Sequence, residues 1–392
     1  MKEFGGQKGT IFIILSSHML LYFMASTLYG SDYRTYIPTI DTFGVVFGYH
    51  IVQMIFAKFM PGITVKGMSN LGYMCNGYAS FYGTLLLAYG LYTYELLDLT
   101  KIVTEYPKFL TTTNIIGNIY SVVLYMCSSE GNSIYDFFMG GILHPRISNI
   151  DIKMLLETRL SWTLLFLITL GGYLEKMKTE GYGNPLLFMV LAHWLYANAC
   201  AKGEHFIPYT WDIFYEKLGW MLCFWNISGV PMLYSYQTLY LIKNKVELPL
   251  YFYGAITTVL LLAYWIWDEC NYQKNLYKSI ERREVINRKL FPTFRSLPVN
   301  PRVLKSEKGT LLIDGWYKYG RKIHYTADIV MALCWGLSCG FDSIYPYVYV
   351  IFFIIMIIHR TYRDEERCSK KYSDIWDKYI SFVPYRFIPY VY

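Results

Sequence analysis

Charged residues are scarce in this chain of 392 residues. Asp, Glu, Lys and Arg make up 17% of it, against about 25% in an average soluble domain. Hydrophobic residues account for 54% and aromatic residues for 19%. So apolar and aromatic a composition excludes a disordered chain, and long apolar runs with few charges between them argue against soluble domains. A membrane protein is therefore expected.

Clustered metal ligands are also missing. Membrane enzymes that hold two irons need about eight histidines in clustered boxes, whereas this chain has seven, none in an HxxxH or HxxHH spacing. The eight cysteines are scattered and form no CxxC pair. Most lie in apolar runs, where cysteine behaves as a small hydrophobe. No metal is expected, and neither a zinc site nor a disulfide framework is indicated.

Two further absences limit the fold. No GxGxxG sequence follows a strand pattern, which excludes a Rossmann dinucleotide site. No small-residue cleavage site follows the first apolar run, so this run is expected to remain as a helix and not to be a signal peptide.

Apolar runs are what the sequence has in abundance. Crossing a bilayer takes roughly 20 apolar residues, and the runs predict an all-α, polytopic membrane protein with about ten transmembrane helices. The expected spans are 10–30, 40–60, 69–94, 109–128, 160–176, 184–200, 218–242, 248–267, 326–340 and 344–361. The span 326–340 is short for a crossing, so a broken or re-entrant helix buried by protein is an alternative there.

Basic residues predict the topology. Three acidic residues between Asn271 and Thr310 oppose ten basic ones: Lys274, Lys278, Arg282, Arg283, Arg288, Lys289, Arg295, Arg302, Lys305 and Lys308. Excess Lys and Arg marks cytoplasmic loops, so with ten spans both termini are expected in the cytoplasm, and Arg146, Lys153 and Arg159 fall on the same side. The polar and aromatic tail after Arg363 is expected to form a short helix and a docked end.

Three segments of the C-terminal third place cations beside rings and carboxylates. Lys274 and Lys278 are four residues apart and share a helix face, where they repel unless an anion lies between them. Helical spacings also relate Arg321, His324, Tyr325 and Asp328, and then Arg360, Asp364, Arg367, Lys371 and Tyr372. A dinucleotide with a phosphorylated ribose would suit such a set. The alternative is that these charges only anchor helices at anionic lipid, and spacing leaves both open.

Candidate acids lie between the sixth and seventh spans. Glu204 and Asp212 stand there among aromatic residues. They are either simple loop charges or carboxylic acids kept partly dry, whose pKa burial would raise, making them proton donors. His193 is alone on an apolar helix and is expected to hydrogen-bond in the core. Tyr234 is one of 40 tyrosines, so taken singly it indicates little.

Two C-terminal segments, LLIDGWYKYGRKIHYTAD and HRTYRDEERCSKKYSDIWDKYISFVPYRFIPYVY, resemble the signature regions of the sterol reductase family. This family includes the carbon-14, carbon-7 and C-24(28) sterol reductases and the membrane domain of the lamin B receptor. The likeness covers nearly the whole chain, from EFGG through HPRI and DIKMLLETRLSW to Tyr392. The segments LAHWLYANACAKGE, TWDIFYEKLGWMLCFWNISGVP and RKIHYTAD are most similar to the fungal C-24(28) reductases, which catalyse the last step of ergosterol synthesis.

The resemblance implies a ten-helix enzyme of the endoplasmic reticulum membrane that reduces a sterol double bond with NADPH. Residues 1–247 are expected to form the sterol-side pocket, and residues 248–392 the cytoplasm-facing NADPH pocket. Sterol and membrane lipid are the expected partners, and nucleic acid is not. Reduction is expected at C-24(28), by alkene protonation and then hydride transfer. Carbon-14 or carbon-7 reduction, a non-catalytic sterol-binding scaffold, and an isoprenylcysteine methyltransferase using S-adenosylmethionine, similar only in the C-terminal third, remain alternatives.

Site residues follow from the resemblance and the spacings. Lys274 and Lys278 match cations at the 2′-phosphate. The other positions expected to bind the cofactor are Leu312, Tyr317, Arg321, His324, Tyr325, Asp328, Arg360, Asp364 and Tyr372. The candidate catalytic residues on the sterol side are Glu204, Asp212 and Tyr234.

This chain departs from the commonest family pattern at four positions. Many members have Trp at Tyr317, Asn at His324 and Arg at Lys278, and His144 replaces a usual Asn. The histidine at position 324 is shared with the C-24(28) subgroup, so it points to subtype and not to loss of activity.

Overall fold

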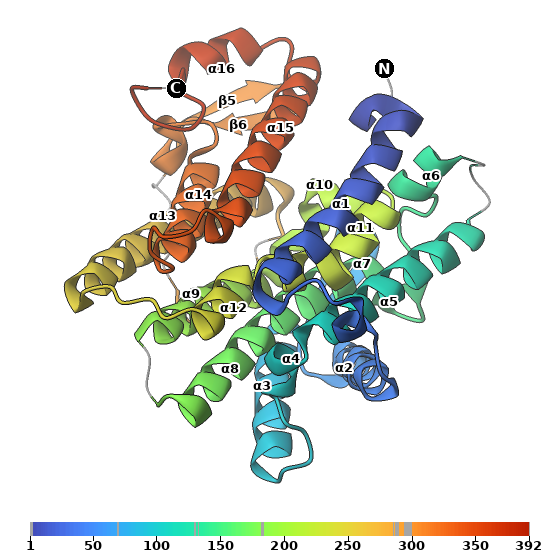
Figure 1. Cartoon of the computed structure of the whole chain (residues 1–392). Helices are drawn as coiled ribbons and strands as arrows, with labels where there is room; N and C mark the ends of the chain where they lie inside the picture. The colour runs from blue at the N-terminus through green and yellow to red at the C-terminus, as the bar shows by residue number, and fades with distance from the viewer. Residues whose placement is uncertain are drawn as a thin grey trace. The chain divides into compact units, whose positions relative to one another are not determined.

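The computed structural model describes residues 3–391 except 69, 129–130, 132, 182–183, 285, 287–289 and 294–299. The chain divides into two compact units, Met1–Val246 and Glu247–Tyr392. Helices dominate both units, and the strands of the described residues form only two-stranded antiparallel hairpins (Figure 1). The all-α prediction is confirmed.

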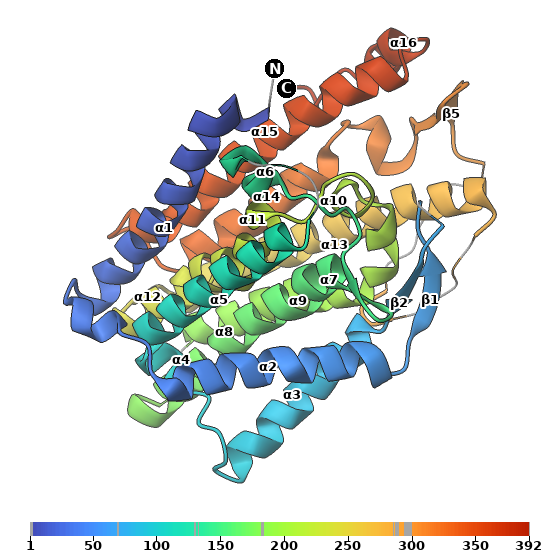
Figure 2. The same ribbon diagram turned by 90° about the vertical axis from the view of Figure 1, so that its right-hand side faces the viewer.

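A helix stands at each apolar run predicted in the N-terminal unit. The longer helices are α1 (Gly6–Tyr29), α2 (Ile40–Phe59), α3 (Gly77–Thr93), α5 (Tyr106–Met126), α8 (Trp162–Thr179) and α9 (Asn184–Lys202). The shorter ones are η1 (Glu3–Gly5), η2 (Tyr33–Tyr36), α4 (Lys101–Thr104), α6 (Ile134–Met139), α7 (Ile152–Met154), η4 (Glu204–Tyr209), α10 (Trp211–Phe214), α11 (Trp220–Phe224) and α12 (Tyr236–Lys243). α8 and α9 run side by side in both views (Figures 1 and 2).

Two stretches of this unit widen into π-helical turns, η3 (Leu155–Ser161) and η5 (Trp225–Leu233). η3 joins α7 to α8, so that one helical stretch runs from Ile152 to Thr179. η5 contains Pro231 and interrupts the span predicted at 218–242. η3 and η5 pack against each other. Because π-helical turns are rare and recur at functional sites, they draw attention to the middle of this unit.

The C-terminal unit is built on three helices, α13 (Leu250–Arg282), α14 (Ile323–Leu337) and α15 (Val348–Lys371), with α14 packed against both others. Its smaller elements are β5 (Val303–Ser306), β6 (Gly309–Leu312), η6 (Gly315–Lys318), η7 (Tyr345–Tyr347) and α16 (Trp376–Phe382). The β5–β6 hairpin lies beside α16 (Figure 1). Side chains of and next to these elements form one buried cluster, namely Leu304, Ile313, Tyr379 and Val383.

Among the described residues, five helical stretches are long and apolar enough to cross a membrane: Glu3–Tyr29, Tyr33–Phe59, Ile152–Thr179, Leu250–Arg282 and Tyr345–Lys371. The protein is therefore a polytopic membrane protein. Helices also occupy the other predicted spans, but they are shorter or less apolar. α14 has 15 residues, which agrees with the short element expected at 326–340.

The ends of α2 show how local sequence sets a helix. The Thr39 hydroxyl accepts the Thr42 backbone N–H at 3.3 Å, and the Thr42 hydroxyl accepts the Thr39 N–H at 3.1 Å. This reciprocal cap satisfies two N–H groups that have no partner within the helix. The helix ends at Phe59 because Met60 precedes Pro61, and a residue before proline is pushed into an extended conformation.

Three hairpins were not predicted. They pair β1 (Ile63–Lys66) with β2 (Gly72–Cys75), β3 (Arg146–Ile147) with β4 (Ile150–Asp151), and β5 with β6. The start of the span predicted at 69–94 was wrong, because Gly72–Cys75 satisfy their backbone groups with β1 and the helix begins only at Gly77.

The basic stretch 271–310 is not one loop. Its first part continues α13 to Arg282, and its last part forms the β5–β6 hairpin. Three of its predicted basic residues, Arg288, Lys289 and Arg295, lie outside the described residues.

Candidate functional site

A buried apolar cluster holds α13, β6, η6 and α14 together in the C-terminal unit. It consists of Cys270, Leu312, Tyr317 and Ile323, with Ile266 and Trp316 packed against it. Two of the predicted cofactor positions, Leu312 and Tyr317, are therefore brought together. The Trp316 indole donates to Glu269 at 2.8 Å, and its backbone N–H donates to Gln273 at 3.0 Å, which ties η6 to α13.

Charged side chains of α13, of the start of α14 and of α15 lie close together beside this apolar cluster. We call Lys274, Lys322, His324, Arg360 and Asp364 the cationic cluster. Lys322 forms an ion pair with Asp364, and Lys274 interacts electrostatically with both. His324 interacts with Lys274, Lys322, Asp364 and Arg360. Three predicted segments thus converge, as a shared site requires.

Cations outnumber carboxylates in the cationic cluster. Burial lowers the pKa of the Lys322 ammonium, but the Asp364 carboxylate opposes this and the net shift is upward, so Lys322 stays charged. Lys274 and Arg360 are exposed. One carboxylate against three basic side chains leaves a surplus of positive charge, which favours an anionic ligand.

Two buried polar atoms next to this surplus have no hydrogen-bond partner among the described residues. They are His324 Nδ1 and the Tyr317 hydroxyl, and their side chains are 8% and 5% exposed. The two rings lie 6.1 Å apart. An unsatisfied buried polar group costs about 1–3 kcal/mol, so a ligand that offers hydrogen-bonding groups would relieve both. The residues present therefore fit a phosphorylated ligand with polar ring substituents, such as a nicotinamide dinucleotide.

Lys278 lies on α13 as predicted, one turn beyond Lys274. Its ammonium donates to the Thr310 carbonyl at 2.8 Å and pairs with Glu281 at 3.0 Å. The Thr310 hydroxyl also donates to Glu281, at 2.7 Å. Lys278 thus joins α13 to the β5–β6 hairpin, with its side chain 29% exposed.

The remaining predicted cofactor residues surround the cationic cluster less directly. The Tyr325 ring lies 4.1 Å from His324. Asp328 is buried one helical turn further along α14. Tyr372 is buried at the end of α15, with its ring 4.8 Å from the Lys371 ammonium.

Arg321 does not belong to the cationic cluster. Its Nε donates to Glu365 at 3.0 Å, and its Nη1 donates to the Val383 and Pro384 carbonyls at 2.6 and 2.8 Å. The predicted stripe of Arg321 and Asp328 on one helix face was wrong, because α14 begins only at Ile323. The adjacent Lys322 takes the position beside Asp364.

In the N-terminal unit, Glu204 lies in a buried network of hydrogen bonds. Its Oε1 is 2.6 Å from Arg159 Nη2 and accepts the Thr158 hydroxyl at 3.1 Å, while its Oε2 accepts the Gly77 N–H at 2.6 Å. Arg159 also donates to the Asn76 side chain at 2.7 Å. Glu204 is fully buried and Arg159 is 3% exposed. A paired cation and a backbone donor favour the ionised carboxylate.

Asp212 lies on α10, which packs against η4, the element that begins at Glu204. Its carbonyl is held by the buried Lys153, whose ammonium also donates to the carbonyls of Ile213 and Glu216, at distances of 2.9, 2.6 and 2.8 Å. The Asp212 residue itself is only partly buried. This arrangement keeps a carboxyl group near solvent on a rigidly held segment.

Tyr234 follows directly after η5 and is 5% exposed. Its ring lies 6.0 Å from that of Trp162, which in turn lies 4.4 Å from Tyr196. The Tyr234 phenol is therefore buried beside aromatic side chains of α8 and α9. His193 on α9 is buried and hydrogen-bonded to Thr169 at 2.6 Å, so the core role expected for it is confirmed.

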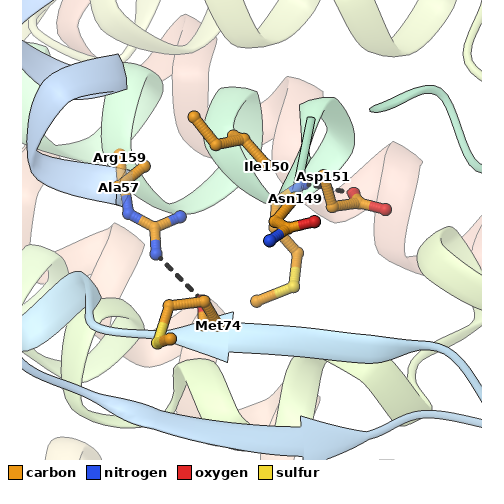
Figure 3. A pocket seen from close by; sticks show the side chains of 7 residues that line it. Ala57, Met74, Asn149, Ile150, Asp151 and Arg159 are labelled. Atoms are coloured by element: carbon orange, nitrogen blue, oxygen red, sulfur yellow. Dashed lines mark hydrogen bonds between the residues drawn. The ribbon is translucent and has the colours of Figure 1, made fainter. Parts of the chain in front are cut away.

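A small cavity lies beside the Arg159 network (Figure 3). It encloses about 230 Å³, open space included, and is lined by Ala57, Met74, Asn149, Ile150, Asp151, Met154 and Arg159. Arg159 donates to the Met74 carbonyl at 3.3 Å across it. Because charged and amide side chains line part of this space, it does not resemble the mostly apolar pocket that a sterol requires.

Sequence reasoning missed two residues that organise these sites. Lys322 adjoins Arg321 and was passed over because helical spacing was counted from Arg321. Arg159 was counted only as a topological charge. A usable signal was present, since an arginine inside an apolar run needs a partner, but Glu204 is 45 residues away and spacing does not identify it.

Comparison with known proteins extends over both units. The sequence model of the ergosterol biosynthesis ERG4/ERG24 family matches residues 2–392 of this chain. A Delta(24(24(1)))-sterol reductase of Gibberella zeae is 37% identical, over 99% of this chain and 73% of its own length. Another, erg4A of Aspergillus fumigatus, is 35% identical over 99% of this chain and 92% of its own. A Delta(14)-sterol reductase of Methylotuvimicrobium alcaliphilum is 31% identical over 91% of this chain and 84% of its own.

The resemblance found in the sequence is thereby confirmed along its whole length, since the match includes the cationic cluster of one unit and the Arg159–Glu204 network of the other. The chain belongs to the ergosterol biosynthesis ERG4/ERG24 family, a family of membrane-bound sterol reductases.

Proposed function

We propose that the protein reduces the C-24(28) double bond of a sterol with NADPH, the last step of ergosterol biosynthesis. The observation that carries this proposal is the match along 99% of the chain to two reductases named for the Delta(24(24(1))) position. The proposed setting is the endoplasmic reticulum membrane, with both termini in the cytoplasm and sterol and lipid as partners.

The cationic cluster supports the cofactor half of the proposal. Lys274, Lys322 and Arg360 would neutralise phosphate groups, and Lys278 would lie at the 2′-phosphate side. Asp364 holds the Lys322 ammonium in place. His324 Nδ1 and the Tyr317 hydroxyl are the atoms available for polar groups of the ligand. NADPH, when bound, supplies hydride.

An isolated alkene gives hydride no electrophilic carbon, so the chain must first supply a proton. Protonation at C-28 leaves a tertiary cation at C-24, and hydride then completes the bond. A donor kept from bulk water serves this step. Of the three predicted candidates, the buried Tyr234 is proposed as the donor and the partly exposed Asp212 as a relay of protons from solvent. Glu204, which is paired with Arg159 and accepts the Gly77 N–H, is proposed to fix the surrounding backbone.

Isotope labelling tests the reaction. Purified protein is given NADPH and a panel of sterols unsaturated at C-24(28), C-14 or C-7, and products are identified by mass spectrometry. We expect turnover of the C-24(28) sterol, with solvent deuterium at C-28 and cofactor deuterium at C-24. Turnover at C-14 or C-7 instead would change the substrate, and sterol binding without NADPH oxidation would indicate a scaffold.

Variants test the residues. Asp328→Ala and Arg360→Ala are expected to lower turnover, whereas Lys370→Ala, an exposed residue of α15, serves as control. Unchanged turnover in both test variants would reject the proposed pocket. Glu204→Gln separates the acids: loss of the chemical step in folded protein would identify Glu204 as the donor, and retained turnover would leave Tyr234 and Asp212.

A further inference from the structure

The segment after α16 is docked on the start of α14 by consecutive backbone carbonyls. Arg321 Nη1 donates to the Val383 and Pro384 carbonyls at 2.6 and 2.8 Å. Further along, the carbonyls of residues 385, 386 and 387 accept the Arg321 N–H, the Lys322 N–H and the Thr326 hydroxyl, at 2.9, 2.8 and 2.7 Å. Five carbonyls in a row are thus bound. We call residues 383–387 the strap; it is the docked end expected from the sequence.

Glu365 fastens this strap from the side of α15. Its Oε1 accepts Arg321 Nε at 3.0 Å, and its Oε2 accepts Arg386 Nε at 2.8 Å. The side chains of Glu365 and Arg321 are 11% and 6% exposed, so the bridge is largely shielded from water. The Arg386 guanidinium also lies 5.4 Å from the Tyr362 ring. One carboxylate therefore joins the strap, the segment before α14, and α15.

The same two chain segments carry the central ion pair of the cationic cluster. Arg321 pairs with Glu365, and the next residue, Lys322, pairs with Asp364, the residue before Glu365. Two adjacent residues before α14 thus pair with two adjacent residues of α15. Any shift of α15 along the start of α14 would break both ion pairs together. The Lys322 backbone N–H is also held by the strap. The position of Lys322 and Asp364 is therefore fixed through Glu365.

We propose that Glu365 is a positioning residue for cofactor binding: by joining Arg321 and Arg386 it locks the strap on α14 and places Lys322 and Asp364 against the phosphorylated ligand. This rests on the proposed NADPH function. Both carboxylate oxygens of Glu365 are bound within the protein, one by Arg321 and the other by Arg386. Glu365 acts through two residues of the cationic cluster: Asp364, which precedes it, and Lys322, which follows its partner Arg321.

The test compares Glu365→Gln with Glu366→Gln in the full-length protein. Both residues lie on α15, and each variant removes one negative charge, but Glu366 is exposed and pairs with Lys370 in the next turn. We expect Glu365→Gln to raise the KM for NADPH about tenfold or more, since displacement of a binding group by about 1 Å can cost about 100-fold. The kcat should change less than twofold, and Glu366→Gln should match wild type.

Hydrogen exchange gives the second readout. The Arg321 and Lys322 amide protons, which the strap binds, should exchange faster in Glu365→Gln and at the wild-type rate in Glu366→Gln. If Glu365→Gln does not fold, Arg386→Lys replaces it, since this side chain is 31% exposed and keeps its charge. It should raise the KM by a smaller factor in the same direction.

Two outcomes overturn the proposal. One is a KM for NADPH that stays within twofold of the Glu366→Gln value. The other is faster exchange of both amides with no change in KM, which would make the bridge purely structural. Calorimetric binding of 2′-phospho-ADP-ribose gives the same comparison without turnover. If the wild type reduces no sterol but binds this ligand, and Glu365→Gln weakens the binding, the proposed reaction fails while the positioning role stands.

Discussion

Each unit contains a buried pairing of a cation with a carboxylate, and the two pairings are built for different ends. In the N-terminal unit, Arg159 and Glu204 neutralise each other and are almost wholly buried, although Arg159 Nε has no hydrogen-bond partner among the described residues. In the C-terminal unit, Lys322 and Asp364 adjoin two exposed cations and two unsatisfied polar atoms. We call the first network closed because its two charges cancel each other, and the second open because cations outnumber carboxylates in it.

The difference shows how to separate structure from function when the residue types are the same. In a closed network the charges neutralise each other within the protein, so removal of one partner lowers the free energy of unfolding. An open network keeps surplus charge and unsatisfied atoms, which cost stability unless a ligand completes them. Burial of a charged pair alone does not identify a site, whereas the balance of charge around it does.

The largest expected effect falls on the closed network. Arg159→Met should lower the free energy of unfolding by about 3–5 kcal/mol, because it leaves Glu204 buried without its partner. The double variant Arg159→Met/Glu204→Gln should recover part of this loss. Thermal unfolding in detergent measures both. A loss no greater than that of Lys370→Met, which breaks an exposed pair on α15, would mean that the network is not closed as described.

A smaller effect is expected where α3 approaches the same carboxylate. A Cβ atom on Gly77 would lie 3.0 Å from the Glu204 carboxyl group. Gly77→Ala should therefore cost about 1–3 kcal/mol of unfolding free energy through overpacking. Gly90→Ala, in the same helix with nothing within 4 Å of the added Cβ, is the matched control and should be neutral or slightly stabilising. Equal melting temperatures for the two variants would contradict the close fit.

The smallest effect concerns the frame of the open network. Asp314 accepts the backbone N–H groups of Arg302 and Gly315 at 3.1 and 2.9 Å, and these bonds lower its pKa from 3.8. Asp314→Asn should cost roughly 0.5–1 kcal/mol at neutral pH, the low end for a partly exposed cap.

The pH dependence of that cost gives its check. A depressed folded pKa means that the stabilisation is complete above the pKa of the unfolded carboxyl, 3.8, and is lost as the pH falls through the lower folded value. The difference between wild type and Asp314→Asn in chemical unfolding should therefore vanish below that range. If the difference in unfolding free energy persists at the lowest pH, the effect of the substitution comes from the geometry of the side chain and not from its charge.

Much of the fold could be predicted because membrane helices are visible in a sequence as long apolar runs. Every predicted span contains a helix, and Lys274 and Lys278 do share the continuous helix α13. The hairpins escaped prediction because strands such as Gly72–Cys75 are four residues long and lie within an apolar run. Their formation depends on a partner strand, which composition does not reveal.

The site was harder to predict than the fold. The convergence of Lys274, His324 and Asp364 follows from family resemblance and helical spacing together. The exchange of Arg321 for Lys322 depends on where α14 begins, and Arg321 is drawn away by carbonyls 62 and 63 residues later in the chain. Contacts over such separations come from tertiary packing, which local periodicity does not encode.

The length of α13 has a consequence for how the protein sits in lipid. Its 33 residues make a rod of about 50 Å at 1.5 Å per residue, whereas the hydrocarbon layer is about 30 Å thick. If Leu250 marks one edge of that layer, the rod leaves it near Cys270, one turn before Lys274. A thicker bilayer would draw these lysines toward the headgroups, and a thinner one would release them into water. Bilayer thickness is thus a physical variable to which the affinity for a charged ligand should respond.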